Sequence, residues 1–172
     1  MALIKEGQFV EDAWCTVGDG EDMPADCPAI ISLDRWQADR ETLLKRNAPL
    51  GIKLESGQDP EEIKDDLDRF DVIALEFPQF KNGRGYSYAR LLRERYGYQK
   101  ELRAVGDVLR DQLLFMARCG IDAFEVSERI TLDGYRAAMD EISVFFQPAA
   151  DDRAPVLSLR DRLAAQATAK TA

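Results

Sequence analysis

The sequence predicts one α/β domain in which a mostly parallel sheet of five strands lies between two layers of helices. Short, nearly continuous apolar runs alternate with amphipathic segments from residue 28 onward, and five such runs fit strands that are buried on both faces. Because each strand is followed by a helix, the connections are crossovers, which make neighbouring strands parallel. A chain of 172 residues is long enough for one such domain and short for two. A partial (β/α) barrel is the alternative, because the alternation does not show whether the sheet curls.

The first 27 residues are predicted to form a small hairpin followed by an acidic arm. Leu3–Val10 holds two apolar runs around a glycine turn, which is typical of a hairpin, and we expect it to be an appendage of the domain. Between Glu11 and Asp26 the chain has six acidic residues and no basic one. A solvated loop is the expected structure of this arm, and a docking surface for a basic partner is the alternative.

The α/β domain is predicted to span residues 28–147. Its five strands are expected at Pro28–Leu33, Leu50–Leu54, Asp71–Phe77, Leu102–Gly106 and Ile121–Val126. Residues 148–172 are rich in alanine and charge, and we expect them to form a frayed tail or a loosely docked helix.

Helix starts follow from the residues that come directly after the strands. The expected N-caps are Asp34, Asp59, Asp107 and either Thr131 or Asp133. A further helix is predicted over Tyr86–Tyr96 from its periodicity. The inward face of the last helix is expected to hold Tyr135, Met139, Ile142 and Phe146.

Composition excludes several classes of protein. The net charge of −9 argues against nucleic-acid binding, because phosphate neutralisation drives that affinity. No apolar run approaches the ~20 residues of a membrane-spanning helix, and the first residues turn polar too soon for a secretory signal. We therefore expect neither a membrane nor a nucleic acid as partner.

Cysteine and histidine content bears on cofactors and location. Cys15, Cys27 and Cys119 are odd in number and far apart, which argues against a disulfide framework and predicts a cytoplasmic protein. The absence of histidine and of a CxxC pair excludes haem ligation by histidine and the usual zinc sites. No intrinsic metal or cofactor is predicted, and a dissociable nucleotide or flavin stays open. Cys119 is expected to be a small buried residue rather than a nucleophile.

A candidate anion site follows from the loops beyond the carboxyl ends of the strands, where parallel α/β folds bind ligands. The loop from Phe77 to Tyr88 holds two glycines and opens into a helix, so its backbone N–H groups and cationic side chains suit sulfite, sulfate or phosphate. A structural turn with solvated arginines is the alternative. The candidate anion-binding residues of this loop and the next are Lys81, Gly83, Arg84, Gly85, Tyr86, Ser87, Arg90, Asp107, Arg110 and Asp111.

This site requires that the two loops leave the same edge of the sheet side by side. Arg84 and Arg110 would then converge, and Glu76 and Glu125 would supply carboxylates at the same edge. Asp107 is otherwise an ordinary N-cap residue. Without a histidine, any general acid or base must be a carboxylate, lysine, tyrosine or thiol.

These segments also carry a family resemblance. The runs in question are Arg46–Gly51, Gly83–Arg93, Glu101–Gln112 and Gly120–Glu125. They resemble the bacterial domain-of-unknown-function family 934, described as an oxidoreductase of sulfite reduction, and the likeness runs from about Leu3 to Gln147. Similar sequences tend to have Asp where Asn82 stands here, which argues against a metal-binding or proton-transferring carboxylate at that position. The family offers no established catalytic residues to carry over.

The resemblance implies a role in assimilatory sulfate reduction. The expected function is that of an accessory protein that supports sulfite reductase, its implied partner, because the chain holds no redox centre of its own. The alternative is an oxidoreductase of sulfite reduction that uses a dissociable nicotinamide or flavin cofactor at the strand edge.

Overall fold

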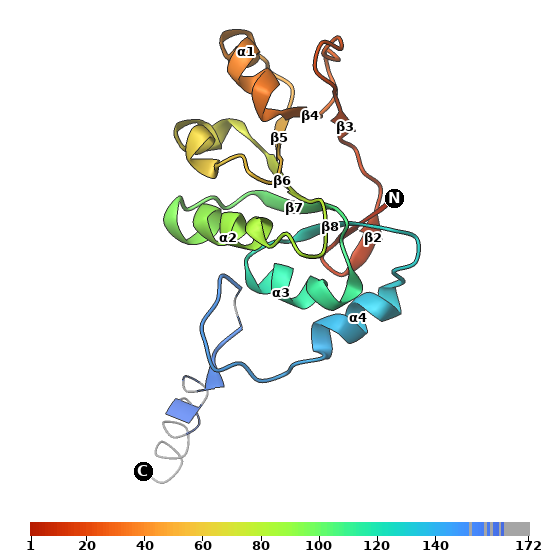
Figure 1. Ribbon diagram of the computed structural model, residues 1–172, viewed down its shortest axis with the longest axis vertical. Helices are drawn as coiled ribbons and strands as arrows, with labels where there is room; N and C mark the ends of the chain where they lie inside the picture. Colours follow the sequence, from red (N-terminus) through yellow and green to blue (C-terminus); the bar gives the residue numbers. More distant parts are fainter. Residues whose placement is uncertain (152, 157, 159, 162, 164–172) are drawn as a thin grey trace.

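The computed structural model describes residues 1–151, 153–156, 158, 160, 161 and 163, which build an α/β fold around one curled sheet (Figure 1). The sheet has eight strands in the order β2-β1-β8-β7-β6-β5-β4-β3. These strands are β1 (Ala2–Lys5), β2 (Gln8–Val10), β3 (Cys15–Thr16), β4 (Ala29–Ser32), β5 (Leu50–Leu54), β6 (Val72–Phe77), β7 (Glu101–Gly106) and β8 (Ala123–Val126).

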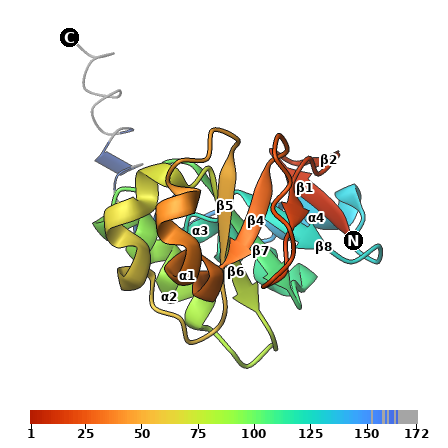
Figure 2. The ribbon, with the colours of Figure 1, turned by 90° about the horizontal axis from the view of Figure 1, so that it is seen from above.

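The predicted five-stranded sheet is therefore too small. Strands β4 to β8 are the five that were expected, but β3 extends them in parallel, and the β1–β2 hairpin joins β8 antiparallel. The hairpin is not an appendage, because β1 pairs with β8 from Ala2↔Val126 to Lys5↔Ala123. The sheet curls into a half-barrel, as the partial-barrel alternative anticipated (Figures 1 and 2).

Helices cover the outer face of this half-barrel (Figure 1). They are α1 (Leu33–Leu43), the 3-10 helix η1 (Pro60–Arg69), α2 (Arg84–Arg90) with its π-helical continuation η2 (Leu91–Arg95), the short 3-10 turn η3 (Arg110–Gln112), α3 (Leu113–Arg118) and α4 (Leu132–Asp140). Because β3 to β8 follow one another in sequence order, right-handed crossovers place the connecting helices on one face. The predicted arrangement with helices on both faces is therefore wrong.

Two of the predicted N-caps are confirmed and two are wrong. The side chains of Asp59 and Thr131 accept hydrogen bonds from backbone N–H groups in the first turns of η1 and α4. Helix α1 is capped by Ser32 instead of Asp34, since the serine hydroxyl accepts from the N–H of Arg35. Asp107 caps no helix, because the next helical turn, η3, starts only at Arg110 after the N-cap residue Leu109.

Alternation along the strands separates an apolar from a polar face. On β6, Ile73, Leu75 and Phe77 belong to the main core beneath the helices. Val72, Ala74 and Glu76 point to the opposite, concave face. The main core therefore lies on the helix-covered side of the sheet, and a smaller buried cluster of Ile30, Val72 and Ala74 lies on the concave face.

The chain after α4 differs from its prediction. Helix α4 ends at Asp140, so Ile142 and Phe146 are not on its inward face, and Phe146 is 77% exposed. Residues 148–151 and 153–156 lie against the body, where Ala150 N–H donates to Arg118 O at 3.0 Å. The rest of the tail prediction falls mostly outside the described residues. Among the described residues, no helix combines the length and apolar character that a membrane crossing requires.

Candidate functional site

A charged cavity of about 270 Å³ lies on the concave face of the half-barrel. Each of the neighbouring strands β5 to β8 contributes one charged side chain to its lining: Lys53, Glu76, Arg103 and Glu125. In the sheet register Lys53 and Arg103 both flank Ala74, so that a small residue separates two cations. Strand order and alternation thus bring side chains together from four distant parts of the sequence.

Lys53 and Glu76 form an ion pair within this cavity. The Lys53 Nζ lies 2.8 Å from the Glu76 Oε1, and both side chains remain about a quarter exposed. Glu125 enters the cavity from β8, and the described part of the chain gives it no ion pair. The Lys53 amine and the carboxylates of Glu76 and Glu125 are therefore accessible to a ligand from the same space.

Arg103 anchors a segment that spans the open side of the half-barrel. We call residues 11–14 the strap, because they connect β2 at one edge of the sheet with β3 at the other (Figure 1). The buried guanidinium of Arg103 donates to Asp12 Oδ2 at 2.7 Å and to Glu101 Oε1 at 2.8 Å. Trp14, at the other end of the strap, packs against the small apolar cluster of the concave face. The strap therefore roofs the sheet, and its residue Asp12 forms part of the cavity lining.

The cavity suits a small polar molecule. Its volume is below the ~300–1,000 Å³ of sites that enclose drug-sized ligands or cofactors. Lys53 provides a cation, and Glu76 and Glu125 provide hydrogen-bond acceptors or a general base.

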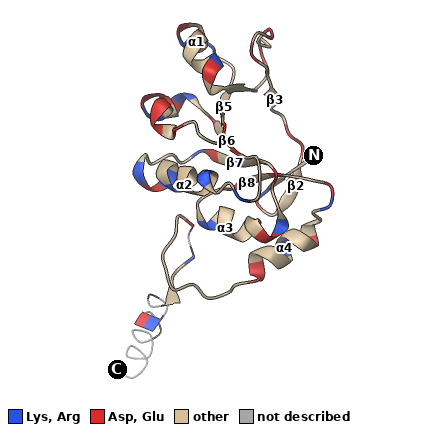
Figure 3. Cartoon of the chain, viewed as in Figure 1, with Lys and Arg blue, Asp and Glu red and all other residues tan. Residues whose placement is uncertain are grey.

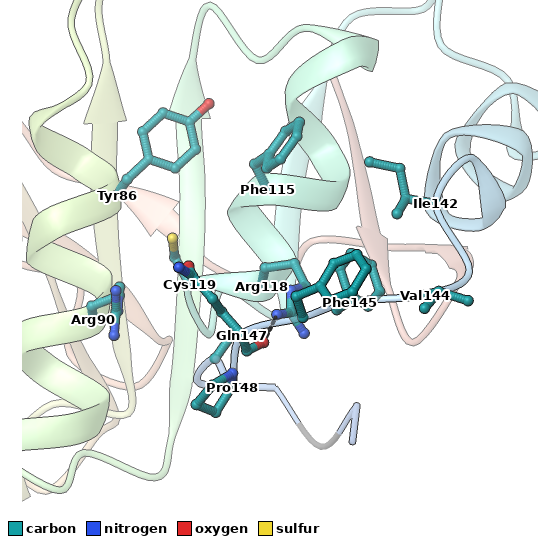
Figure 4. A pocket seen from close by; sticks show the side chains of 12 residues that line it. Tyr86, Arg90, Phe115, Arg118, Cys119, Ile142, Val144, Phe145, Gln147 and Pro148 are labelled. Atoms are coloured by element: carbon teal, nitrogen blue, oxygen red, sulfur yellow. Dashed lines mark hydrogen bonds between the residues drawn. The ribbon is translucent and has the colours of Figure 1, made fainter. Parts of the chain in front are cut away.

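A second, larger and mainly apolar hollow of about 690 Å³ lies on the outer side of the molecule (Figure 4). Its walls are α2, α3 and the segment after α4, and its lining residues are Tyr86, Arg90, Phe115, Arg118, Cys119, Ile142, Val144, Phe145, Phe146, Gln147, Pro148 and Ala149. Residues 142–150 carry no charge, in a chain of which 32% is charged (Figure 3). Phe115 and Phe146 are more than half exposed. We refer to this region as the apolar hollow.

Arg118 holds the wall of the apolar hollow in place. Its guanidinium lies 4.0 Å from the ring centroid of Phe145, pairs with Asp151 at 2.8 Å and donates to the Gln147 carbonyl at 2.7 Å (Figure 4). Three contacts of one partly buried arginine therefore attach the segment after α4 to helix α3.

Two titratable groups face the apolar hollow in their neutral forms. Burial raises the pKa of Tyr86 to about 12, and burial likewise raises the pKa of the Cys119 thiol. Cys119 is half-buried at the end of α3, beside the hollow. A raised pKa disfavours the thiolate, which agrees with the predicted structural role.

The predicted anion-binding residues fall into separate places. Lys81, Gly83 and Arg84 line a shallow hollow with Gln79 and Asn82. Arg90 pairs with Glu94, and Asp107 and Asp111 have no side-chain hydrogen bond among the described residues. Tyr86 and Arg90 border the apolar hollow instead, and Ser87 lies on α2 between them.

Arg84 and Arg110 do not converge as predicted. Their loops do start side by side, since Asp107 N–H donates to Phe77 O at 2.7 Å. Arg84, however, approaches Gly57 in the loop after β5, whereas the Arg110 Nε donates to Gly134 O at the start of α4. The two side chains point to opposite neighbours, so no shared pocket forms.

Gly85 serves packing rather than ligand approach. A Cβ at this buried position would lie 2.5 Å from the ring of Phe77, which also contacts Tyr86 edge-on at 5.2 Å between centroids. Only glycine lets α2 lie this close to β6.

Of the four charged residues that strands β5 to β8 contribute to the cavity, the sequence predicted two and missed two. Glu76 and Glu125 were expected to share an edge of the sheet, and they do line one cavity. Lys53 and Arg103 were overlooked, although each is a lone charge inside an apolar run. A charge at an alternate position of a supposedly buried strand indicates that one face of the sheet is uncovered.

The cysteines are arranged in a way that their spacing did not predict. Cys15 and Cys27 lie with their sulfur atoms 3.6 Å apart at the β3 edge of the sheet, whereas Cys119 lies at the end of α3. Among the residues that the structure describes, no group of three or more metal-ligating side chains gathers in one place.

The fold and these hollows define an α/β half-barrel protein with a charged concave face and an exposed apolar hollow on its outer side. The chain belongs to the family described as "Bacterial protein of unknown function (DUF934)", whose model matches residues 51–157. The match confirms the family resemblance but begins later than expected and extends beyond Gln147 into the segment that closes the apolar hollow. No curated protein matches the chain.

Proposed function

We propose that this protein is an accessory factor of assimilatory sulfate and sulfite reduction, and that it docks on sulfite reductase through the apolar hollow. Two kinds of support meet in this proposal. The pathway is the one implied by the likeness to the family. The accessory role is supported by an exposed apolar surface on a chain whose described residues gather no metal ligands.

The exposed aromatic side chains of the apolar hollow are the observation on which docking rests. Phe115, Val144 and Phe146 are 54%, 49% and 77% exposed and lie within one lining. Contiguous exposed apolar surface of this kind typically marks an interaction site. Acidic residues gather instead on η1 (Figure 3) and none of those described lines the hollow, so the partner surface that fits the hollow is apolar rather than basic.

Co-purification tests the docking. The tagged chain, expressed in cells that grow on sulfate as sulfur source, is expected to enrich sulfite reductase. The double variant Phe115→Ser, Phe146→Ser should lose it, whereas Phe80→Ser should retain it, because Phe80 is 60% exposed on the loop after β6, outside the hollow. Equal enrichment by both variants, or none by the native chain, would contradict the proposal. A dimer that only the double variant disrupts would assign the hollow to a second copy instead.

The second part of the proposal is a small oxyanion site, which is restricted to the loop after β6. Lys81 and Arg84 flank the shallow hollow after β6, and no ion pair of either is found among the described residues. Asn82 connects this loop to Ser56, and its Oδ1 accepts from the N–H of Arg84. Calorimetric titration with sulfite should show binding that Lys81→Ala with Arg84→Ala abolishes and Arg110→Ala leaves unchanged. Loss of binding in Arg110→Ala alone would contradict this placement.

An oxidoreductase with a dissociable cofactor is the alternative, favoured by the size and lining of the apolar hollow. Its 690 Å³ lies within the range of cofactor sites, and it combines aromatic rings with Arg90 and Arg118. An absorption spectrum of the purified protein and titration with flavin and nicotinamide nucleotides separate the two functions. Nucleotide binding that is weakened in Phe115→Ser would favour the oxidoreductase. If no nucleotide binds, docking remains the proposed function of the hollow.

A further inference from the structure

Two cysteines that are twelve positions apart in the sequence meet at the edge of the sheet. The Cys15 and Cys27 sulfur atoms are 3.6 Å apart. The sheet fixes this neighbourhood through its backbone, because Cys15 pairs with Ala29 and its N–H donates to Pro28 O at 3.1 Å. Cys27 directly precedes Pro28. The approach of the two thiols therefore follows from the register of β3 and β4.

The loop that carries Cys27 is attached to the rest of the molecule. The Arg46 guanidinium donates to the carbonyls of Pro24 and Cys27, both at 2.6 Å. Cys27 is exposed, whereas Cys15 is half-buried on β3. One thiol of the pair is thus open to an external reagent, and the other lies behind it.

We propose that Cys15 and Cys27 are a redox-active dithiol that exchanges reversibly with an external disulfide. A disulfide bond has a sulfur–sulfur distance of about 2.05 Å, so the pair must approach by about 1.5 Å. Exchangeable disulfides of this type are the kind found in reducing compartments. The proposal is independent of the proposed docking, because neither cysteine lines the apolar hollow.

The reaction has two steps that balance in atoms and electrons. The exposed Cys27 thiolate attacks one sulfur of a disulfide RSSR, which forms a mixed disulfide and releases one thiolate RS⁻. The Cys15 thiolate then attacks the Cys27 sulfur, which forms the Cys15–Cys27 bond and releases the second RS⁻. The dithiol loses two electrons and two protons, and RSSR becomes two molecules of RSH.

The order of attack follows from the surroundings of the two thiols. Burial and the hydrogen bond with Cys27 raise the pKa of Cys15, while the Arg46 charge partly offsets this by lowering it. Cys15 is also the less exposed of the two thiols, so it acts second. The closed bond would join β3, which directly follows the strap, to the loop before β4.

Thiol counting across a glutathione series tests the pair in the full-length chain. The protein is equilibrated with mixtures of reduced and oxidised glutathione, quenched with acid, unfolded, alkylated and weighed by mass spectrometry. Oxidising mixtures should convert three alkylatable thiols into one, with Cys15 and Cys27 in one linked peptide, and added reduced glutathione should restore all three.

Variants separate this outcome from general thiol oxidation. Cys119→Ser should show the same transition, whereas Cys27→Ser should form no internal bond. Cys15→Ser should stop at a glutathione adduct on Cys27. The proposal is overturned if the native chain keeps three thiols, accumulates only glutathione adducts, links Cys119, or is not reduced again.

Discussion

The two faces of the half-barrel differ in what their side chains do, although they alternate along the same strands. Towards the helices, β6 presents Ile73, Leu75 and Phe77, each at most 1% exposed. Towards the concave side, the same strand presents Ala74 and Glu76, and the glutamate takes part in an open ion pair. Burial of apolar area stabilises the first face, whereas the second face carries accessible charge.

This difference shows where the fold tolerates function. The exposed charges of the concave face, such as Lys53 and Glu76, can change without disturbing the main core, because helices cover only the other side. The apolar hollow is the exception on the outer side, since there the segment after α4 leaves aromatic residues exposed. Substitutions that compare the two faces directly test this view.

The largest effect is expected for Phe77→Ala on the helix-covered face. The ring is fully buried, lies against Gly85 and contacts Tyr86 edge-on, so its removal opens a cavity. We expect a loss of about 3–5 kcal/mol in the free energy of unfolding, measured by urea denaturation. Phe80→Ala, at an exposed position, serves as control and should change it by less than about 0.5 kcal/mol.

The next effect concerns Arg103, the buried charge of the concave face. Its guanidinium is 2% exposed and bonds Asp12 and Glu101, so Arg103→Met leaves two carboxylates without this partner. We expect a loss of about 3 kcal/mol and a strap that proteases cleave more readily. Lys100→Met removes a surface pair with Asp71 and should cost less than about 1 kcal/mol. If Arg103→Met and Lys100→Met lost the same free energy of unfolding, the buried charge that anchors the strap would contribute no more than a surface charge.

Part of this fold was predictable because the spacing of apolar residues along the sequence reflects which side chains are buried. The five parallel strands and the Asp59 and Thr131 caps follow from short-range patterns, and the structure bears them out. Whether the sheet is covered on one face or both is a long-range property. The lone charges of Lys53 and Arg103 inside apolar runs indicate that one face of the sheet is uncovered, and an uncovered face favours the half-barrel.

The candidate site was harder to predict because side-chain direction decides it. The loops bearing Arg84 and Arg110 do begin next to each other, as adjacent strands require. Their side chains then turn to opposite neighbours, towards Gly57 and Gly134. Likewise, the contact of Cys15 with Cys27 depends on β3, a two-residue strand that has no periodicity to detect.

A smaller, pH-dependent effect is expected at Tyr98 on the helix-covered side. Burial raises the pKa of its phenol above the ordinary value of 10.0, and the hydroxyl donates to Phe70 O at 3.1 Å. The unfolded chain therefore loses this proton more readily than the folded protein. The resulting stability is complete below pH 10 and is lost as the pH rises from there through the folded pKa.

The variant Tyr98→Phe measures what the phenol hydroxyl contributes to the free energy of unfolding. At pH 7 it should cost about 1 kcal/mol, because the Phe70 carbonyl loses its donor. The difference between native and variant should shrink as the pH rises above 10, in urea denaturation at matched ionic strength. A difference that stays constant up to pH 12 would mean that the phenol ionises equally in both states.

The smallest effect is expected where the concave face is open, at the pair Lys53 and Glu76. The ammonium and carboxylate are 30% and 25% exposed, so water screens their attraction and solvates each partner when the other is lost. Lys53→Met and Glu76→Gln should each change the free energy of unfolding by about 0.5 kcal/mol, and the double variant should show a coupling of similar size. Losses near those of Arg103→Met would show that the cavity charges hold the sheet together. Small losses would leave these charges available to a ligand, because the core behind β6 does not depend on them.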